Sequence, residues 1–103
     1  MIRKVRWSKD ALEDLKSMLA YIDYENPVAA RRVAAALQDA ADGLGRFLTG
    51  RPGRLAGFYE KSVSNLPYII AYEVWAQGGV EIVMIVRVIH TARDWPKDAW
   101  PES

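Results

Sequence analysis

Residues 68–89 read YIIAYEVWAQGGVEIVMIVRVI, a stretch that predicts two long strands joined by a tight turn. Tyr68–Trp75 is rich in aromatic and β-branched residues, and Val80–Ile89 is apolar except at two positions. Between them, Gln77-Gly78-Gly79 supplies the glycines that a short hairpin turn needs. The stretch is therefore expected to form the antiparallel centre of a sheet.

The last strand is expected to turn one of its faces towards a helical layer. Side chains alternate along a strand, so residues two apart share a face. One face is wholly apolar and is expected to cover the helices: Val80, Ile82, Met84, Val86 and Val88. The other carries two charges and is expected to be partly open: Glu81, Val83, Ile85, Arg87 and Ile89. Arg87 is thereby expected to be an exposed cation.

Two helices are predicted upstream of this hairpin. Ser8 is a good N-cap, and the first helix is expected to run from there to about Tyr24. Its apolar residues recur at helical spacing: Leu12, Leu15, Leu19 and Ile22. Asn26 and Pro27 form a cap and a first helical position, so a second helix is expected over residues 27–47. The short link makes the two helices an antiparallel hairpin.

Two shorter strands and a loop complete the predicted fold. Ile2–Trp7 and Phe58–Val63 are expected to be strands, and Gly50–Arg54 is a turn-rich basic loop. The element order is β-α-α-β-β-β, an α+β fold with the N-terminal strand and the helical hairpin packed on one face of an antiparallel sheet. Residues 1–103 are expected to form one domain, with an irregular tail over 94–103.

The composition excludes several classes of site. The chain has 103 residues, no cysteine and one histidine, His90, so neither disulfides nor a thiolate or histidine-rich metal centre is expected. We expect no metal and no cofactor. No stretch has the roughly 20 apolar residues of a membrane helix, and no export signal is evident. The chain is therefore expected in the cytoplasm, with no membrane partner.

Charge is segregated along the chain although the net charge is only +1. Residues 1–9 and 46–61 are basic, whereas residues 10–45 between them contain seven acidic and three basic residues. Charge runs are usually solvated faces. The two basic segments would form one patch only if the fold brought them together, which the sequence does not show.

Several short motifs occur in order along nearly the whole chain. They are V-x-W-S from Val5, Asp14-Leu15 and Tyr21-Ile22, then ENPVAARRV, the Gly50-Arg51 loop, NLPYIIAYEV and RVIHTARDWP. In this order and length, the chain resembles the RelE/ParE superfamily of type II toxin–antitoxin toxins, in particular its ParE-like branch.

The resemblance implies a partner and one of two targets. ParE-like toxins bind DNA gyrase, convert it into a source of DNA breaks and block replication. RelE-like toxins are ribosome-dependent nucleases that cut messenger RNA. Both kinds are neutralised by a cognate antitoxin. The resemblance therefore implies a hetero-oligomer with a ParD-like antitoxin, through which alone the chain is expected to reach DNA.

The residues favour the gyrase target over the nuclease. Cleavage of RNA without a metal needs a base, an acid and cations that stabilise the developing charge. If the chain is a nuclease of the RelE type, which is the alternative, its catalytic groups are Lys61, Arg87, His90 and Arg93. However, the strand position where such toxins carry an arginine is Ile69, and neither a tyrosine nor a lysine-rich segment follows Arg93. This depleted set favours an inhibitor that acts by protein–protein contact.

The segment RVIHTARDWP, residues 87–96, is the predicted target-binding surface. The residues proposed to contact the target are Arg87, His90, Arg93 and Trp95. Each also has a purely structural interpretation. His90 at a strand end is often hydrogen-bonded, Arg93 can pair with Asp94, and Trp95 can cover the core.

The predicted antitoxin-binding surface is the helical hairpin. An amphipathic helix binds in an apolar groove, which two helices of a small domain can offer. The candidate contacts are Leu12, Leu19 and Tyr24 on the first helix and Val33 and Leu37 on the second. An extended antitoxin segment pairing with an exposed sheet edge is a further possibility.

Overall fold

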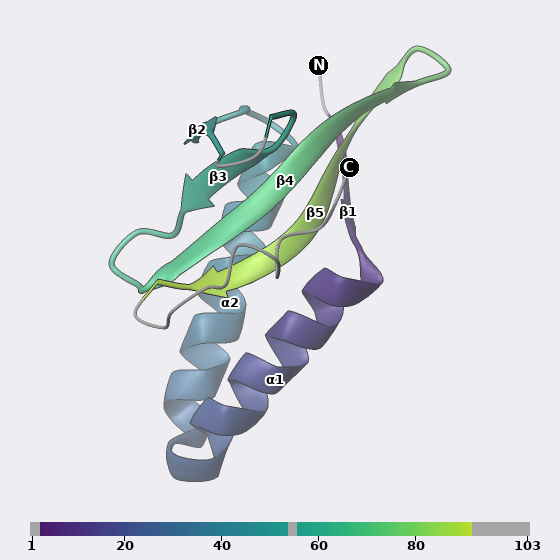
Figure 1. Cartoon of the computed structure of the whole chain (residues 1–103). Helices are drawn as coiled ribbons and strands as arrows, with labels where there is room; N and C mark the ends of the chain where they lie inside the picture. The colour runs from purple at the N-terminus through teal and green to yellow at the C-terminus, as the bar shows by residue number, and fades with distance from the viewer. Residues whose placement is uncertain (1–2, 54–55, 92–103) are drawn as a thin grey trace.

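The computed structural model describes residues 3–53 and 56–91, and its helices pack on one face of a sheet (Figure 1). The elements are β1 (Lys4–Trp7), α1 (Lys9–Glu25), α2 (Pro27–Leu44), β2 (Arg51–Pro52), β3 (Tyr59–Ser62), β4 (Tyr68–Gln77) and β5 (Val80–His90). The predicted α+β fold, with a helical hairpin against a sheet, is confirmed. The predicted tail, residues 94–103, lies outside the described residues.

The sheet is mixed, whereas the sequence predicted an antiparallel one. The strand order is β1-β5-β4-β3-β2, and β1 pairs parallel with β5, from Lys4 opposite Ile82 to Trp7 opposite Ile85. The helical hairpin follows β1 directly in the chain. The strand that pairs with β1 is therefore β5, from the far end of the sequence. The short strand β2 lies in the segment expected to be a loop, and it pairs with β3. The other strand pairs are antiparallel.

Local capping explains where the helices begin. The Ser8 hydroxyl oxygen accepts a hydrogen bond from the Ala11 amide at 3.1 Å, and the Asn26 side chain accepts one from the Ala29 amide at 3.0 Å. Pro27 occupies the first turn of α2, where a missing N–H costs nothing. Both predicted helix starts are confirmed. Helix α2 ends at Leu44, before the predicted residue 47.

The central strand pair contains a bulge, and the predicted faces of β5 are wrong before it but right after it at Val88 and Ile89. Tyr72 pairs with Ile85 but Ala71 pairs with Arg87, so Val86 is an extra residue in β5. Before the bulge, Val83 and Ile85 pack in the core beneath the helices, on the face that the alternation assigned to solvent. After it, Val88 joins that core. The opposite face of the sheet has a smaller buried cluster, formed by Phe58, Ile69, Ala71, Val86 and Ile89.

Gly50 lets the segment after α2 run close to β3. Its φ is +111°, and a Cβ there would lie 2.4 Å from the Glu60 carbonyl oxygen. We expect Gly50→Ala to lower the free energy of unfolding by about 2 kcal/mol, because both the backbone angle and the contact must change. Gly43→Ala is the control, since a Cβ in that helical position meets nothing within 4 Å. Urea unfolding of the two variants is the measurement, and equal stabilities would contradict this account.

Candidate functional site

The N-terminal turn of α1 is joined to the middle of β5. Strand β1 ends at Trp7, and Ser8 then donates its amide to the Ile85 carbonyl at 2.9 Å and its hydroxyl to the Val86 carbonyl at 3.1 Å. In the described part of the chain, no strand pairs with β5 on this side beyond Ile85. Helix α1 therefore takes the place of a strand neighbour along the rest of β5.

Asp14 and Arg87 form an ion pair that joins helix α1 to strand β5. The Asp14 carboxylate accepts hydrogen bonds from Arg87 Nε at 2.7 Å and Arg87 Nη2 at 2.9 Å, and also from the Val88 amide at 3.0 Å. The side chains are only 15% and 21% exposed, respectively. The hydrogen bond to Asp14 raises the pKa of the Arg87 guanidinium, while burial opposes that rise. Arg87 is thus held against α1 and is not the exposed cation that the sequence predicted.

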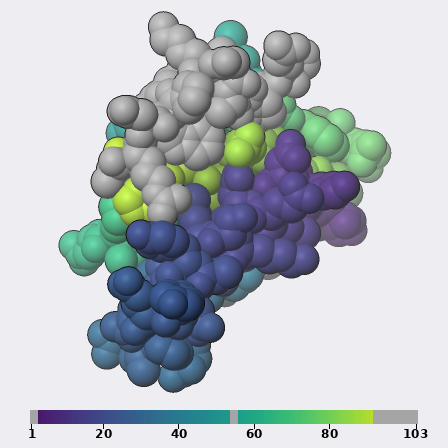
Figure 2. All heavy atoms as spheres, turned by 60° about the horizontal axis from the view of Figure 1, so that its bottom comes forward, coloured from purple at the N-terminus to yellow at the C-terminus, as the bar shows by residue number. Residues whose placement is uncertain are grey.

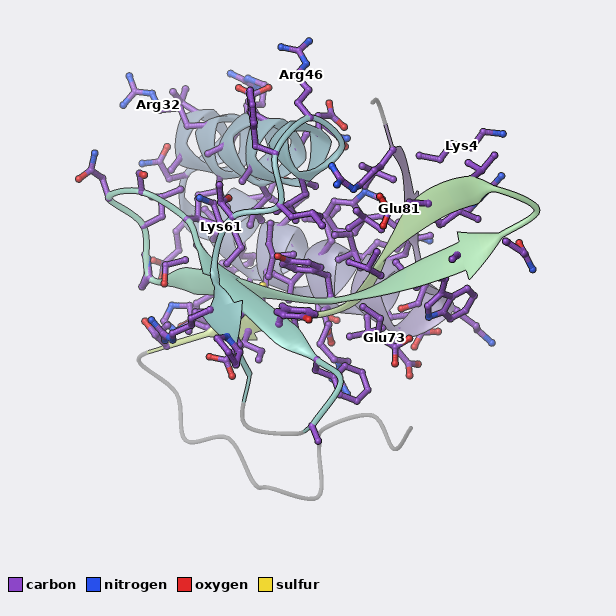
Figure 3. All side chains as sticks on the ribbon, turned by 90° about the horizontal axis from the view of Figure 1, so that it is seen from above. Lys4, Arg32, Arg46, Lys61, Glu73 and Glu81 are labelled. Carbon is purple, nitrogen blue, oxygen red and sulfur yellow. The ribbon has the colours of Figure 1, made fainter. Side chains whose placement is uncertain are left out.

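The other candidate catalytic groups lie apart from Arg87. His90 is half-buried at the end of β5, where its ring meets Tyr68 edge-on with centroids 5.2 Å apart. Lys61 is half-buried on β3, beside a hollow of about 290 Å³ next to α2 (Figure 3). The strand register places Ile70 and Val88, both fully buried, between Lys61 and the end of β5. These described groups do not converge on one site.

Arg93 and Trp95, the remaining predicted target contacts, lie outside the described residues. Over residues 3–53 and 56–91, no group of three histidine or acidic side chains is arranged to hold a metal ion. Neither described helix is both long and apolar enough to span a membrane.

The helical hairpin has a groove between its two helices near the tip. The groove has a volume of about 300 Å³ and is mainly apolar. Its lining comes from both helices: Leu19, Ala20, Asp23, Ala30, Arg31 and Ala34. The small alanine side chains leave this space because they do not fill the gap between helix backbones. Figure 2 shows the outer surface of α1 and the hairpin tip, which extends beyond the sheet in Figure 1.

The predicted antitoxin contacts divide into surface and core residues. Leu12 and Tyr24 are exposed, Tyr24 by 91%, and Leu19 is half-buried in the groove lining. Val33 and Leu37 are buried in the core beneath the sheet, with Leu37 fully inaccessible. These two side chains are therefore not available at the surface of the folded chain, because the helical stripe they belong to faces β4 and β5.

Sequence reasoning missed two features of this surface. Asp14 was noted only as part of a motif, although an acid on a helix face rich in apolar residues indicates a buried cationic partner. The second feature is the groove, whose alanines Ala20, Ala30 and Ala34 carried no prediction. Small residues on the facing sides of both helices were the feature of the sequence that could have indicated this groove.

Comparison with known proteins agrees with this architecture. The family model described as "ParE toxin of type II toxin-antitoxin system, parDE" matches residues 5–95. The chain is 35% identical to a putative toxin, Y4kP, of Sinorhizobium fredii, over 92% of this chain and 95% of that protein. It is 41% identical to the toxin RelE2 of Caulobacter vibrioides, over 87% and 97% of the two chains.

Two solved structures have a similar fold. A chain of the chromosomal ParDE toxin–antitoxin system from P. aeruginosa matches with a TM-score of 0.75 at 17% identity, over 86% of this chain and 96% of that one. A chain of the toxin–antitoxin complex RelBE2 from Mycobacterium tuberculosis matches with a TM-score of 0.60 at 25% identity, over 90% and 95%. The comparisons thus agree with the predicted α+β fold of a helical hairpin packed against a sheet.

Proposed function

Since the chain belongs to the ParE toxin family of type II toxin–antitoxin systems, we propose that it inhibits DNA gyrase by protein–protein contact and so blocks replication. The observation that carries the choice of target is the ion pair between Asp14 and Arg87. A guanidinium held by both oxygens of a carboxylate is poorly placed to stabilise a phosphorane. The proposed site of action is the cytoplasm, where gyrase works.

Two further observations support a contact mechanism over RNA cleavage. The buried side chains of Ile70 and Val88 separate Lys61 from the end of β5, where His90 lies. RNA cleavage needs an acid and a base close to the same phosphate, and the described residues do not bring Lys61 and His90 together in this way. The position at which RelE-like nucleases carry an arginine is Ile69 in this chain. Its side chain is only 8% exposed and packs in an apolar cluster, so it offers no cation to RNA. In this proposal His90, Arg93 and Trp95 form the target-binding surface, and Arg87 positions β5 against α1.

The proposed partner is a ParD-like antitoxin that binds the groove of the helical hairpin. The helical hairpin also exposes apolar and aromatic side chains, and Leu12, Tyr21, Tyr24 and Val28 are all more than two-fifths exposed. Such a patch on a domain of this size is typical of a protein interface. An amphipathic antitoxin helix would bury its apolar face in the groove, and the proposed complex is a hetero-oligomer.

Expression in bacterial cells distinguishes the proposed target from the ribosome. We expect arrest of growth with induction of a DNA-damage reporter, while transcripts in translation stay intact. Coexpression of the cognate antitoxin should restore growth. Cleavage within codons at the ribosomal A site, without a DNA-damage signal, would overturn the gyrase proposal and leave the family assignment intact.

A RelE-type messenger RNA endonuclease is the second candidate function. The observation that favours it is the 41% identity to a toxin named RelE2, together with the fold shared with the RelBE2 complex. In that case Lys61, His90 and Arg93 would have to act on RNA. Replacing Lys61 alone by alanine should then abolish toxicity, whereas a contact inhibitor should lose little, because Lys61 is not among the proposed target contacts.

A further inference from the structure

The groove between α1 and α2, which we call the hairpin groove, has one charged residue on each of its two walls. Asp23 lies on the α1 wall and Arg31 on the α2 wall, and both side chains are exposed. The rest of the lining is apolar: Leu19, Ala20, Ala30 and Ala34. The hairpin groove therefore combines an apolar lining with two opposite charges on opposite sides.

The described residues neutralise neither of these two charges. Asp23 and Arg31 line the same groove, yet they do not pair with each other, and no ion pair among residues 3–53 and 56–91 includes either of them. Both charged groups are therefore available to a partner that enters the groove.

The charge of Asp23 opposes the dipole of its own helix. Asp23 lies in the last turn of α1, where the partial negative charge of the helix end favours a basic residue. That turn contains no basic residue. The charge of Asp23 thus slightly weakens the free helix, and helix stability does not account for an acid at this position.

The dimensions of the lining match one turn of a bound helix. The lining spans residues 19–23 on α1 and residues 30–34 on α2, which is about 6 Å along each helix. An amphipathic helix has an apolar stripe with polar residues on both of its flanks. If its stripe enters the groove, one flank faces Asp23 and the other faces Arg31.

We infer that Asp23 and Arg31 select the antitoxin helix that binds the hairpin groove, an inference that rests on the proposed function. The bound helix has a basic residue on the flank that faces Asp23 and an acidic residue on the flank that faces Arg31. Charged residues that flank an apolar stripe determine partner choice between paired helices in the same way. An antitoxin helix with the opposite arrangement would place like charges together and be rejected.

Charge reversal at the two positions tests this assignment. We expect Asp23→Arg and Arg31→Asp each to raise the Kd for the purified cognate antitoxin about tenfold, because each variant places like charges side by side. Asp23→Arg should leave the urea midpoint of the free chain at or above that of the wild type, since a basic residue suits the last turn of α1. A lower midpoint would show that Asp23 serves the fold and would contradict the inference.

Glu13→Arg and Arg32→Asp are the matched controls. Each makes the same change of charge on the same helix, at an exposed position that does not line the groove. Arg32 points away from the body of the molecule (Figure 3). The Kd of each control should stay within about twofold of the wild-type value. If Asp23→Arg and Arg31→Asp bind no more weakly than their controls, the inference is overturned.

Compensating changes in the antitoxin test each contact separately. Each basic residue of the antitoxin is changed in turn to glutamate, and each variant is titrated against the Asp23→Arg chain. One of them should bring the Kd to within about threefold of the wild-type value, because it restores a pair of opposite charges. The same scan with acidic residues changed to lysine should find one partner for Arg31→Asp. If neither scan restores binding, the two charges do not contact the antitoxin and the inference is wrong.

The failures of the two proposals are distinguishable. If the wild-type chain does not bind the cognate antitoxin, the partner proposal itself is wrong. If it binds, and an arginine in place of Ala20 in the groove weakens binding while the charge-reversal variants behave like their controls, only the inference about Asp23 and Arg31 is wrong.

Discussion

Replacing Asp14 with alanine is expected to lower the free energy of unfolding by about 3 kcal/mol, since it breaks a mostly buried ion pair. The variant removes the carboxylate that binds both Arg87 nitrogens, and it also removes the acceptor of the Val88 amide. The ion pair and the hydrogen bond to the Val88 amide are both lost in the part of β5 that packs against α1 and has no strand neighbour on that side in the described residues. A domain of this size has a total stability of roughly 5–15 kcal/mol, so the variant loses a large part of it.

Glu13→Ala is the control for this prediction, because Glu13 is an exposed acid one residue earlier on the same helix. Urea unfolding followed by circular dichroism should show a change below about 0.5 kcal/mol for Glu13→Ala. A double-mutant cycle with Arg87→Ala should give a coupling energy of about 2 kcal/mol. No coupling, or equal effects of the two acid variants, would show that the helix is not held to β5 through Asp14.

Ala20→Arg should weaken antitoxin binding about 100-fold, corresponding to about 3 kcal/mol. Ala20 is exposed on α1 and lines the hairpin groove, so an arginine there fills the groove and adds a charge to it. The free chain should keep its stability, because alanine and arginine have similar helix propensities at an exposed position. The predicted loss is therefore one of binding alone.

Ala35→Arg provides the matched control on α2. Ala35 is exposed and does not line the groove, so the same substitution adds the same charge elsewhere on the hairpin. Isothermal titration with the antitoxin should give the wild-type Kd within about threefold for this control. If both variants bind like the wild type, the antitoxin does not use the groove. In cells, Ala20→Arg should remain toxic in the presence of antitoxin.

Features set by a few adjacent residues were predicted from the sequence. Ser8 begins α1 and Asn26 with Pro27 begins α2, because a cap acts on amides within the next three residues. The turn between β4 and β5 was predicted for the same reason. Gly78 and Gly79 have φ values of +59° and +77°, which favour glycine.

Features that depend on residues far apart were not predicted. Val86 is extra in β5 because of how β5 pairs with β4, and simple alternation assigned Val83 and Ile85 to the wrong face. Asp14 lies 73 residues before Arg87. No pattern within either segment reveals that the two meet, so Arg87 was expected at the surface.

The candidate surfaces show the same division. Val33 and Leu37 were predicted as antitoxin contacts, but an apolar stripe on a helix does not say whether the sheet or a partner covers it. The structure adds that the sheet covers it, and that the groove lies beside it. The position of the start of β1 beside the end of α2 likewise follows only from the structure, where the Arg3 amide donates a hydrogen bond to the Gly45 carbonyl.

The most direct test of the central claim is a titration of purified DNA gyrase with this chain on relaxed plasmid DNA. A gyrase inhibitor acting by contact should abolish supercoiling, and protein denaturation should release linear plasmid from trapped cleavage complexes. Addition of the antitoxin should reverse the inhibition. Full supercoiling activity at a large excess of folded toxin, with cleavage of messenger RNA in a ribosome-dependent translation reaction, would contradict the claim.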